Sequence, residues 1–294
     1  MQIKNLNQLL KESLIETINL AFSDYEFPIT LNEESFAQFT KSRSVDLEKS
    51  IGYFLNDTLV GFILVGFRTF ASKKYYYDAA TAVIPSHRNK KIGSFLLEHL
   101  IAAVKNENST FSLEVLENNK NAHNLYLKAG FKVSRKFCCY TIEKSKILKP
   151  NNSNDYTIKR LNKQQFIDLN TADFDSFIPS WQNSKISILN DWENYKVLTI
   201  GKDGEIYGYG AINWDKGDIV QLSLQDQNKT IYTLDTLLFE LAKFSTKEKL
   251  TSLNIEEGTY LNSFLLELGW NNFVNQIEMK LCIAKKTLFS GHRV

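Results

Sequence analysis

A basic turn between a strand and a helix, at residues 83–94, constrains this chain more than any other part of its sequence. The residues that lead into it, 75–84, are rich in aromatic and β-branched side chains, which is typical of a strand. The residues that follow repeat apolar side chains at helical spacing. Such a junction directs the free N–H groups of the helix start toward Arg88, Lys90 and Lys91, and this arrangement predicts a phosphate-sized anion site.

A second segment follows with a compatible pattern. Residues 111–116 alternate as a strand does, and a helical stretch then runs to a Gly-Phe step at 130–131. The motifs are Arg88-x-x-Lys91-Ile92-Gly93, Asn119-x-x-Ala122 and Leu125-Tyr126. Together they resemble the GNAT superfamily of acyl-CoA-dependent N-acetyltransferases, most strongly over 75–142. The resemblance implies an α+β fold, that is, a mixed α/β sheet flanked by helices, and acetyl-CoA as co-substrate.

The resemblance also implies which residues bind acetyl-CoA. The strand before the turn offers main-chain groups to the pantetheine arm, and the turn holds the pyrophosphate through backbone N–H groups. The implied residues are Val83, Arg88, Lys90, Lys91, Ile92, Gly93, Ser94, Phe95, Asn119 and Tyr126. Lys91 stands where family members commonly place a glycine, so this residue is either right-handed or strained. A distorted turn that binds weakly is the alternative.

Two residues are candidates for catalysis. Tyr126 is placed to protonate the departing thiolate, although a buried tyrosine that only packs the helix is the alternative. Glu114 alternates away from its apolar neighbours, which places its carboxylate on the other face of the strand. The resemblance implies that a glutamate here, twelve residues before Tyr126, is a candidate base for the attacking amine. Asp78 on the preceding strand and a chain of water molecules are rival bases. Tyr25 and Asp78 are candidate residues of the acceptor side.

The chain is long enough for two domains, because it has 294 residues. A polar, turn-rich linker lies at 149–155, and the pattern Ile-Lys-x-Leu-Asn occurs at 3–7 and again at 158–162. We therefore expect tandem copies of one fold, a catalytic copy at 1–148 and a second at 156–286. The second copy has no basic turn and carries Leu265 at the Tyr126 position, so it is expected to bind no acetyl-CoA.

The charge and cysteine content of the chain restrict the classes of partner and the setting that we expect for it. The net charge of +2 argues against broad nucleic-acid binding. Residues 1–150 carry 20 basic and 15 acidic side chains, whereas the remainder carries 15 and 18. The more positive half contains the anion turn, as a polyanionic ligand favours. Charged side chains within the first 20 residues predict neither a signal peptide nor a membrane span. Three cysteines fit no metal or disulfide spacing, so we expect no metal and a reduced, cytoplasmic setting.

These observations predict a cytoplasmic N-acetyltransferase. It moves the acetyl group of acetyl-CoA to an amine of a small molecule or peptide by direct attack, without nucleic-acid or membrane partners. Two alternatives stay open, a non-catalytic acyl-CoA-binding or sensing protein and an aminoacyl or peptidoglycan-type transferase. Neither the acceptor nor the oligomeric state has a signature in the sequence.

Overall fold

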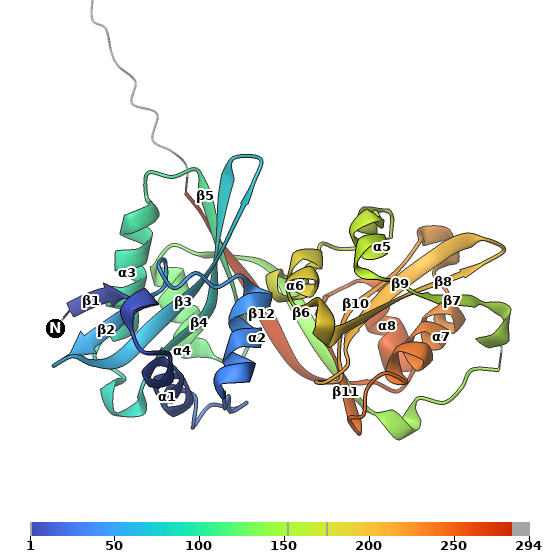
Figure 1. Cartoon of the computed structure of the whole chain (residues 1–294), viewed down its shortest axis with the longest axis horizontal. Helices are drawn as coiled ribbons and strands as arrows, with labels where there is room; N and C mark the ends of the chain where they lie inside the picture. Colours follow the sequence, from blue (N-terminus) through green and yellow to red (C-terminus); the bar gives the residue numbers. More distant parts are fainter. Residues whose placement is uncertain (1, 152, 175, 284–294) are drawn as a thin grey trace, which may run out of the picture. The chain divides into compact units, whose positions relative to one another are not determined.

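The computed structural model describes residues 2–151, 153–174 and 176–283. They form two compact units (Figure 1). The first unit contains 2–115, 119–134 and 278–283, and the second contains 116–118 and the described part of 135–277. The chain therefore crosses between the units four times, at 115–116, 118–119, 134–135 and 277–278. The domain bounds 1–148 and 156–286 stay a prediction, and residues 152 and 284–286 lie outside the described residues.

The helices and strands of each half of the sequence follow the same order. The first half has β1 (Gln2–Asn5), α1 (Lys11–Ala21), α2 (Glu33–Arg43), β2 (Ile51–Leu55), β3 (Thr58–Phe70), β4 (Lys73–Val83), α3 (Ile92–Val104), β5 (Ser109–Leu116), α4 (Lys120–Lys128) and β6 (Lys132–Glu143). The second half has β7 (Thr157–Arg160), α5 (Lys163–Asp168), α6 (Lys185–Asn190), β8 (Tyr195–Lys202), β9 (Glu205–Asn213), β10 (Asp218–Leu224), α7 (Ile231–Ala242), β11 (Lys249–Glu256), α8 (Tyr260–Glu267) and β12 (Asn271–Ile283). This repeat confirms the predicted mixed α/β fold in two copies.

Each unit completes its sheet with a strand from the other half of the sequence. In the first unit the strand order is β1-β2-β3-β4-β5, and β12 lies next to β5. In the second unit the order is β7-β8-β9-β10-β11, and β6 pairs antiparallel with β11. Each of these terminal strands begins in one unit and ends in the other, because the unit boundaries fall at 134–135 and at 277–278.

The pairing of β4 with β5 stops partway along both strands. Their parallel pairs end at Asp78–Leu113, and residues 79–83 of β4 continue beyond the last pair. Ala79 is the extra residue of a β-bulge against β3. A bulge bends its strand and re-aims the side chains around it. We call the region beyond Asp78, between β4 and β5, the first opening.

The second unit repeats this feature at the equivalent place. The parallel pairs of β10 and β11 end at Ile219–Ser252, and Val220 is the extra residue of a bulge against β9. Counting from the two bulges, Ile219 is therefore equivalent to Asp78. We call the region beyond Ile219, between β10 and β11, the second opening.

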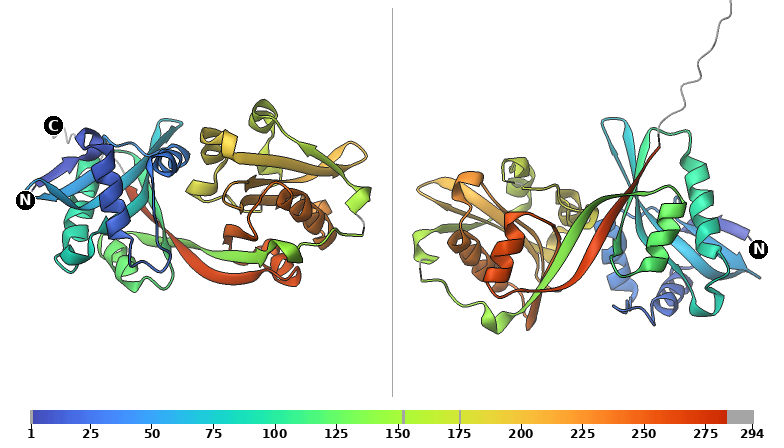
Figure 2. Two further views of the ribbon diagram at one scale, coloured as in Figure 1. Left: turned by 60° about the horizontal axis from the view of Figure 1, so that its bottom comes forward. Right: turned by 180° about the vertical axis from the view of Figure 1, so that it is seen from behind.

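Helices cover both faces of the first sheet (Figure 2). A Cβ atom added at Gly61 would lie 3.0 Å from Ile92 of α3. The ring of Phe62, the next residue, lies 6.4 Å from the ring of Phe22 at the end of α1. Successive side chains of a strand point to opposite faces. The helices α1 and α3 therefore lie on opposite faces of the sheet, and both reach the edge of the first opening.

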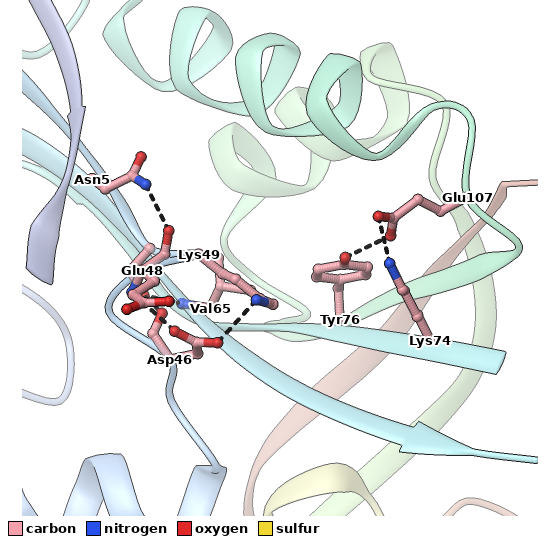
Figure 3. A network of polar contacts seen from close by, with 9 residues as sticks. Asn5, Asp46, Glu48, Lys49, Val65, Lys74, Tyr76 and Glu107 are labelled. Carbon is pink, nitrogen blue, oxygen red and sulfur yellow. Dashed lines mark hydrogen bonds and ion pairs between the residues drawn. The ribbon is translucent and has the colours of Figure 1, made fainter. Parts of the chain in front are cut away.

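Polar side chains fix the start of β4 (Figure 3). Glu107, in the turn before β5, accepts hydrogen bonds from Lys74 Nζ at 2.7 Å and from Tyr76 Oη at 2.6 Å. The ring of Tyr76 also lies 6.2 Å from that of Phe111 on β5. These contacts hold the paired parts of β4 and β5 together, so the two strands are free of each other only past Asp78.

Candidate active site

A pocket of about 470 Å³ lies at the first opening. The end of α1, the unpaired part of β4, the turn before α3 and the first turns of α3 and α4 surround it. Its lining residues are Ala21, Phe22, Tyr25, Thr81, Ala82, Val83, His87, Arg88, Asn89, Lys91, Ile92, Gly93, Ser94, Asn119, Asn121, Ala122, Leu125 and Tyr126. All of them belong to the first unit.

The basic turn forms the anion-binding end of this pocket. The first backbone hydrogen bond of α3 runs from Phe95 N to Lys91 O at 3.0 Å, so the N–H groups of residues 92–94 project from the helix end. No acidic residue occupies the first turn of α3. Asn89 and Lys91 both adopt the left-handed conformation, each with φ of 62°. Of the two conformations that the sequence left open for Lys91, the structure thus has the left-handed one. The positive end of the helix dipole and nearby cations together favour an anion here.

Arg88 holds the turn against α1. Its Nη1 and Nη2 atoms donate to the two carboxylate oxygens of Asp24, each at 2.7 Å, and Nη2 also donates to Ala21 O at 2.8 Å. Its Nε atom donates to Val83 O at 3.1 Å. The hydrogen bonds from Arg88 lower the pKa of Asp24. The guanidinium group therefore lines the pocket while it binds the C-terminal end of α1.

Asn119 connects the far side of the opening to the same segment. Its Oδ1 atom accepts from Ala122 N at 3.1 Å, which caps α4, and its Nδ2 atom donates to Tyr25 Oη at 3.0 Å. Tyr25 follows α1 and lines the pocket. A residue predicted for the pantetheine arm and a residue predicted for the acceptor side thus contact each other.

Tyr126 reaches the pocket from α4 and contacts a buried carboxylate. Its hydroxyl donates to Asp78 Oδ2 at 2.8 Å, and its ring packs against Phe131 with 5.6 Å between centroids. Thr81 Oγ1 donates to the same Asp78 atom at 2.6 Å. Burial raises the pKa of Asp78 to about 6, and burial together with the charge of Asp78 raises the pKa of Tyr126 well above its usual range. Tyr126 therefore keeps its proton at neutral pH.

Glu114 lies on the opposite face of the sheet from Tyr126. It follows Leu113, the last residue of β5 that pairs with β4, and its carboxylate accepts a hydrogen bond from the Tyr77 hydroxyl. Burial, and after it the charge of Glu114, raises the pKa of Tyr77 well above its usual range. Asp78 and Tyr77 are neighbours in β4, so their side chains leave the strand on opposite faces. Tyr126 and Glu114 therefore approach the first opening from its two sides.

The structure brings most of the predicted binding residues to the pocket. Val83, Arg88, Lys91, Ile92, Gly93, Ser94, Asn119, Tyr126 and Tyr25 line it. Lys90, Phe95, Glu114 and Asp78 are not among the lining residues. Lys90 Nζ donates to Ser86 O at 3.1 Å, and the Phe95 side chain is 41% exposed.

Sequence reasoning missed Thr81 and Phe22. Thr81 lies three residues from Asp78, and regular strand alternation would place their side chains on opposite faces. The bulge at Ala79 brings them to the same face, and no residue of the pattern Asp-Ala-Ala-Thr signals it. Phe22 is the residue that ends α1, and no motif in the sequence marks its ring as part of the pocket.

The turn at the second opening differs from the basic turn in length and conformation. Six residues separate β10 from α7, whereas eight separate β4 from α3. The residue before α7, Thr230, is extended with φ of −122° and caps the helix by accepting from Thr233 N. The second turn thus lacks the left-handed residue that precedes α3.

Side chains of the second unit fill the second opening from both faces. On one face, Tyr260 Oη accepts from Leu224 N at 2.9 Å, at the position equivalent to Val83. On the other face, Phe174 and Asn183 bind the two strands. Ser223 Oγ donates to Phe174 O, Gln221 Nε2 donates to Asn183 O, and Asn183 Nδ2 donates to Leu253 O, at 2.7–2.8 Å. A cavity of only about 10 Å³, lined in part by Gln221 and Ser223, lies beside these residues.

Within residues 2–151, 153–174 and 176–283, no helix is long and apolar enough to cross a membrane. In the same part of the chain, no group of three or more histidine, cysteine, aspartate or glutamate side chains is arranged to hold a metal ion.

Residues 12–131 match the model of the acetyltransferase (GNAT) family. Among solved structures, the chain resembles a tandem GNAT protein from the clavulanic acid biosynthesis pathway, with 13% identity, a TM-score of 0.67 and coverage of 93% of this chain and 94% of that one. It also resembles a GCN5-related N-acetyltransferase from Sphaerobacter thermophilus, with 15% identity, a TM-score of 0.65 and coverage of 92% of each chain. No curated protein sequence matches the chain. At these identities the structures share its fold, which is that of two GNAT domains in tandem.

Proposed function

We propose, from the premise that residues 12–131 form an acetyltransferase domain of the GNAT family, that the first unit is an N-acetyltransferase. It transfers the acetyl group of acetyl-CoA to an amine of a small molecule or peptide. The amine attacks the thioester directly, and no acetyl-enzyme forms. One observation carries the proposal: a single pocket joins the free N–H groups of α3 to the Tyr126 hydroxyl.

The residues at the α3 end of the pocket fit the pyrophosphate of acetyl-CoA. A pyrophosphate needs several N–H donors that converge and positive charge around them. Residues 92–94 supply the N–H groups, and the left-handed Asn89 and Lys91 shape the turn that presents them. Gly93 lets the backbone approach the ligand, because it has no side chain toward the pocket. Val83 lies where β4 still pairs with β3 but no longer with β5, and we assign the pantetheine arm to this open edge of β4.

Proton transfers fall to two residues on opposite faces of the sheet. Acetyl-CoA supplies an activated acyl group, and its thiolate needs a proton when it leaves. Tyr126 lines the pocket, and its Oη atom carries such a proton, which it donates to Asp78. Most amines are protonated near neutral pH, so a base must accept a proton before or during the attack. We assign this task to Glu114, whose carboxylate lies beyond the last β4–β5 pair on the other face.

The second unit takes no part in the chemistry. Tyr260 occupies the position of the pantetheine arm, and the turn before α7 lacks the left-handed residue of the basic turn. We therefore propose one acetyl-CoA site per chain. We place the protein in the cytoplasm, where its free cysteines Cys138, Cys139 and Cys282 stay reduced.

Thiol release tests the proposal. The full chain is incubated with acetyl-CoA and a panel of amines that includes polyamines, amino sugars, amino acids and peptides with free N-termini. We expect free CoA thiol to appear in proportion to one class of amine, and the acetylated amine to be found by mass spectrometry. Lys249→Ala, an exposed substitution at the start of β11, is the matched control for handling and purity.

Three results would contradict the proposal in different ways. If calorimetry detects no binding of acetyl-CoA, the pocket is not an acetyl-CoA site. Binding without turnover on any amine would indicate an acyl-CoA-binding or sensing protein. Transfer from an aminoacyl-tRNA donor, with no thiol release from acetyl-CoA, would indicate an aminoacyl transferase.

A further inference from the structure

Asp78 is the only carboxylate that contacts the Tyr126 hydroxyl within the described residues, and its surroundings are unusual. Its side chain is buried, with 6% exposure, and its Oδ2 atom accepts from Tyr126 Oη at 2.8 Å and from Thr81 Oγ1 at 2.6 Å. Both donors are neutral hydroxyls, and no ion pair of the described chain includes Asp78. A buried carboxylate without a cation is destabilising, so its presence needs a reason other than folding.

The bulge in β4 assembles this group of three. In a regular strand, residues three apart point to opposite faces. Because Ala79 is an extra residue, Asp78 and Thr81 point to the same face, toward α4 and Tyr126. Bulges beside functional sites commonly re-aim a side chain in this way. The hydrogen bonds of the group therefore depend on the bulge.

The second unit has the same bulge but has apolar residues in place of Asp78, Thr81 and Tyr126. Counting from Val220, Ile219 replaces Asp78 and Leu222 replaces Thr81, and counting back from Gly269, Leu265 replaces Tyr126. All three replacements are apolar and buried. The fold therefore does not require the polar group, which occurs only in the unit with the open pocket.

We propose that Asp78 is a positioning residue for Tyr126. As Tyr126 protonates the leaving thiolate, Asp78 returns a proton to the phenol oxygen of Tyr126. This inference rests on the proposed acetyl transfer. The C–S bond breaks and its electron pair stays on sulfur, which takes the proton of Tyr126 Oη. The proton of the neutral Asp78 carboxyl moves to the phenol oxygen, so no phenolate forms. Solvent then returns one proton to Asp78.

The direction of the pH dependence follows from the charges around the pair. When Asp78 is ionised, its carboxylate holds the Tyr126 proton away from the pocket, and loss of that proton would leave two adjacent anions. When Asp78 is protonated, it donates to the phenol oxygen, and the Tyr126 proton is free to face the pocket. The other titratable groups that act on the pair are Tyr25, which faces Tyr126, and Tyr77, on the other face of β4. Burial raises the pKa of Tyr77 well above its usual range, so the change near pH 6 belongs to Asp78, whose pKa burial raises to about 6.

The test compares kcat of the wild type and of Asp78→Asn across pH. The asparagine still accepts the Tyr126 hydrogen bond but does not ionise. The ratio of the two kcat values cancels the ionisation of the amine and of Glu114, because both enzymes share them. We expect the wild type to be at least about tenfold faster near pH 5, and the ratio to fall to one or less above pH 8, with a midpoint near 6. The KM for acetyl-CoA should change by less than about twofold.

Thr81→Val is the matched control. Its methyl group keeps the shape of threonine, and the lost hydroxyl had lowered the pKa of Asp78. The midpoint of the pH dependence should therefore move to higher pH, which a merely structural role for Asp78 would not produce. A ratio that stays constant with pH would overturn the proposal, as would an unmoved midpoint in Thr81→Val.

A second readout does not depend on activity. In protein labelled with ¹³C at tyrosine Cζ, the Tyr126 signal is assigned by its loss in Tyr126→Phe. We expect this signal to shift with a midpoint near pH 6 in the wild type and to stay constant in Asp78→Asn. If it shifts while no amine is acetylated, the proposed function fails and the pairing stands. If thiol release is normal and the signal never shifts, the role of Asp78 fails alone.

Discussion

The two openings have the same backbone and opposite contents. In each, a parallel strand pair stops at a β-bulge. The first opening holds a pocket of about 470 Å³, lined by the anion turn and Tyr126. The second is closed by Tyr260 on one face and by Phe174 and Asn183 on the other.

This difference separates what the fold requires from what the chemistry requires. The bulge and the interrupted pairing occur in both units, so they belong to the fold. The left-handed turn, the pair of Asp78 and Tyr126 and the free end of β4 occur only in the first unit. Substitutions at these positions should affect function, whereas substitutions at their equivalents should affect only stability.

The largest effect is expected at Tyr126. Tyr126→Phe keeps the ring that packs on Phe131 and removes the proton donor. We expect kcat to fall by roughly 10²-fold or more, with little change in the Kd of acetyl-CoA. Tyr140→Phe is the control, because it removes a buried hydroxyl that donates to Asn262 at 2.7 Å in the second unit. A kcat of Tyr126→Phe within about twofold of wild type would return Tyr126 to a packing role.

The buried carboxylate predicts a stability effect with a definite sign. The pKa of Asp78 is about 6 in the folded protein and 3.8 as its ordinary value. The folded state holds the extra proton between these values, so the free energy of unfolding falls as pH rises through this window. Asp78→Asn has no such loss. From about pH 4 to about pH 8 it should gain up to about 3 kcal/mol relative to wild type.

Urea unfolding at the two pH values measures this gain. Asp215→Asn, at an exposed turn, controls for the removal of one negative charge. An equal difference between Asp78→Asn and wild type at both pH values would show that the folded and unfolded states bind protons at this position alike.

The anion turn predicts an effect on affinity. Gly93→Val places a branched side chain where the helix N–H groups face the pocket. We expect the Kd of acetyl-CoA to rise at least about tenfold, or ~1.4 kcal/mol. Gly93→Ala, whose Cβ would lie 3.3 Å from Leu125, should have a smaller effect. Isothermal calorimetry on folded variants provides the values, and an unchanged Kd for Gly93→Val would place the ligand elsewhere.

The hydrogen bond from Leu224 N to Tyr260, which closes one face of the second opening, predicts a change in stability alone. Tyr260→Phe leaves Leu224 N without its partner, so the free energy of unfolding should fall by about 1 kcal/mol. Thiol release should stay at the wild-type rate, and calorimetry should still find one acetyl-CoA per chain. Two equivalent sites in the wild type would contradict the comparison of the two units.

The smallest effect is expected at Lys91. Its left-handed conformation is unfavourable for a side chain with a Cβ atom, and glycine would relieve it. Lys91→Gly should raise the free energy of unfolding by less than about 1 kcal/mol. Lys90→Gly is the control, since Lys90 is not among the left-handed residues and its substitution should lower stability. Thermal unfolding of Lys91→Gly and Lys90→Gly measures whether the first variant gains stability while the second loses it.

The sequence predicts the repeat, the basic turn and the candidates Tyr126 and Glu114 because these depend on local patterns. Aromatic strand residues, helical spacing and the loss of the turn in the second half are all visible in the letters. The contact between Asp78 and Tyr126 depends instead on a bulge at Ala79, which breaks the alternation that sequence reasoning assumes. The sequence therefore indicated Asp78 as a possible base but did not indicate it as a partner of Tyr126.

The exchange of terminal strands is invisible for a related reason. The segments β6 and β12 form strands of 12 and 13 residues, and nothing in their sequences names the neighbour that each one joins. Pairing β6 with β11 and placing β12 next to β5 is a long-range choice between two similar edges. Local patterns carry no information on that choice.

The strand exchange also sets the order in which the protein is completed during its synthesis. Residues 278–283 are among the last of the described chain to be translated, yet they belong to the unit that holds the pocket. The ribosome therefore releases the whole acetyltransferase match, 12–131, well before its sheet has its last strand. Until then the edge of β5 is available to other strands, so the nascent first half is the stage of this protein's life most exposed to mispairing.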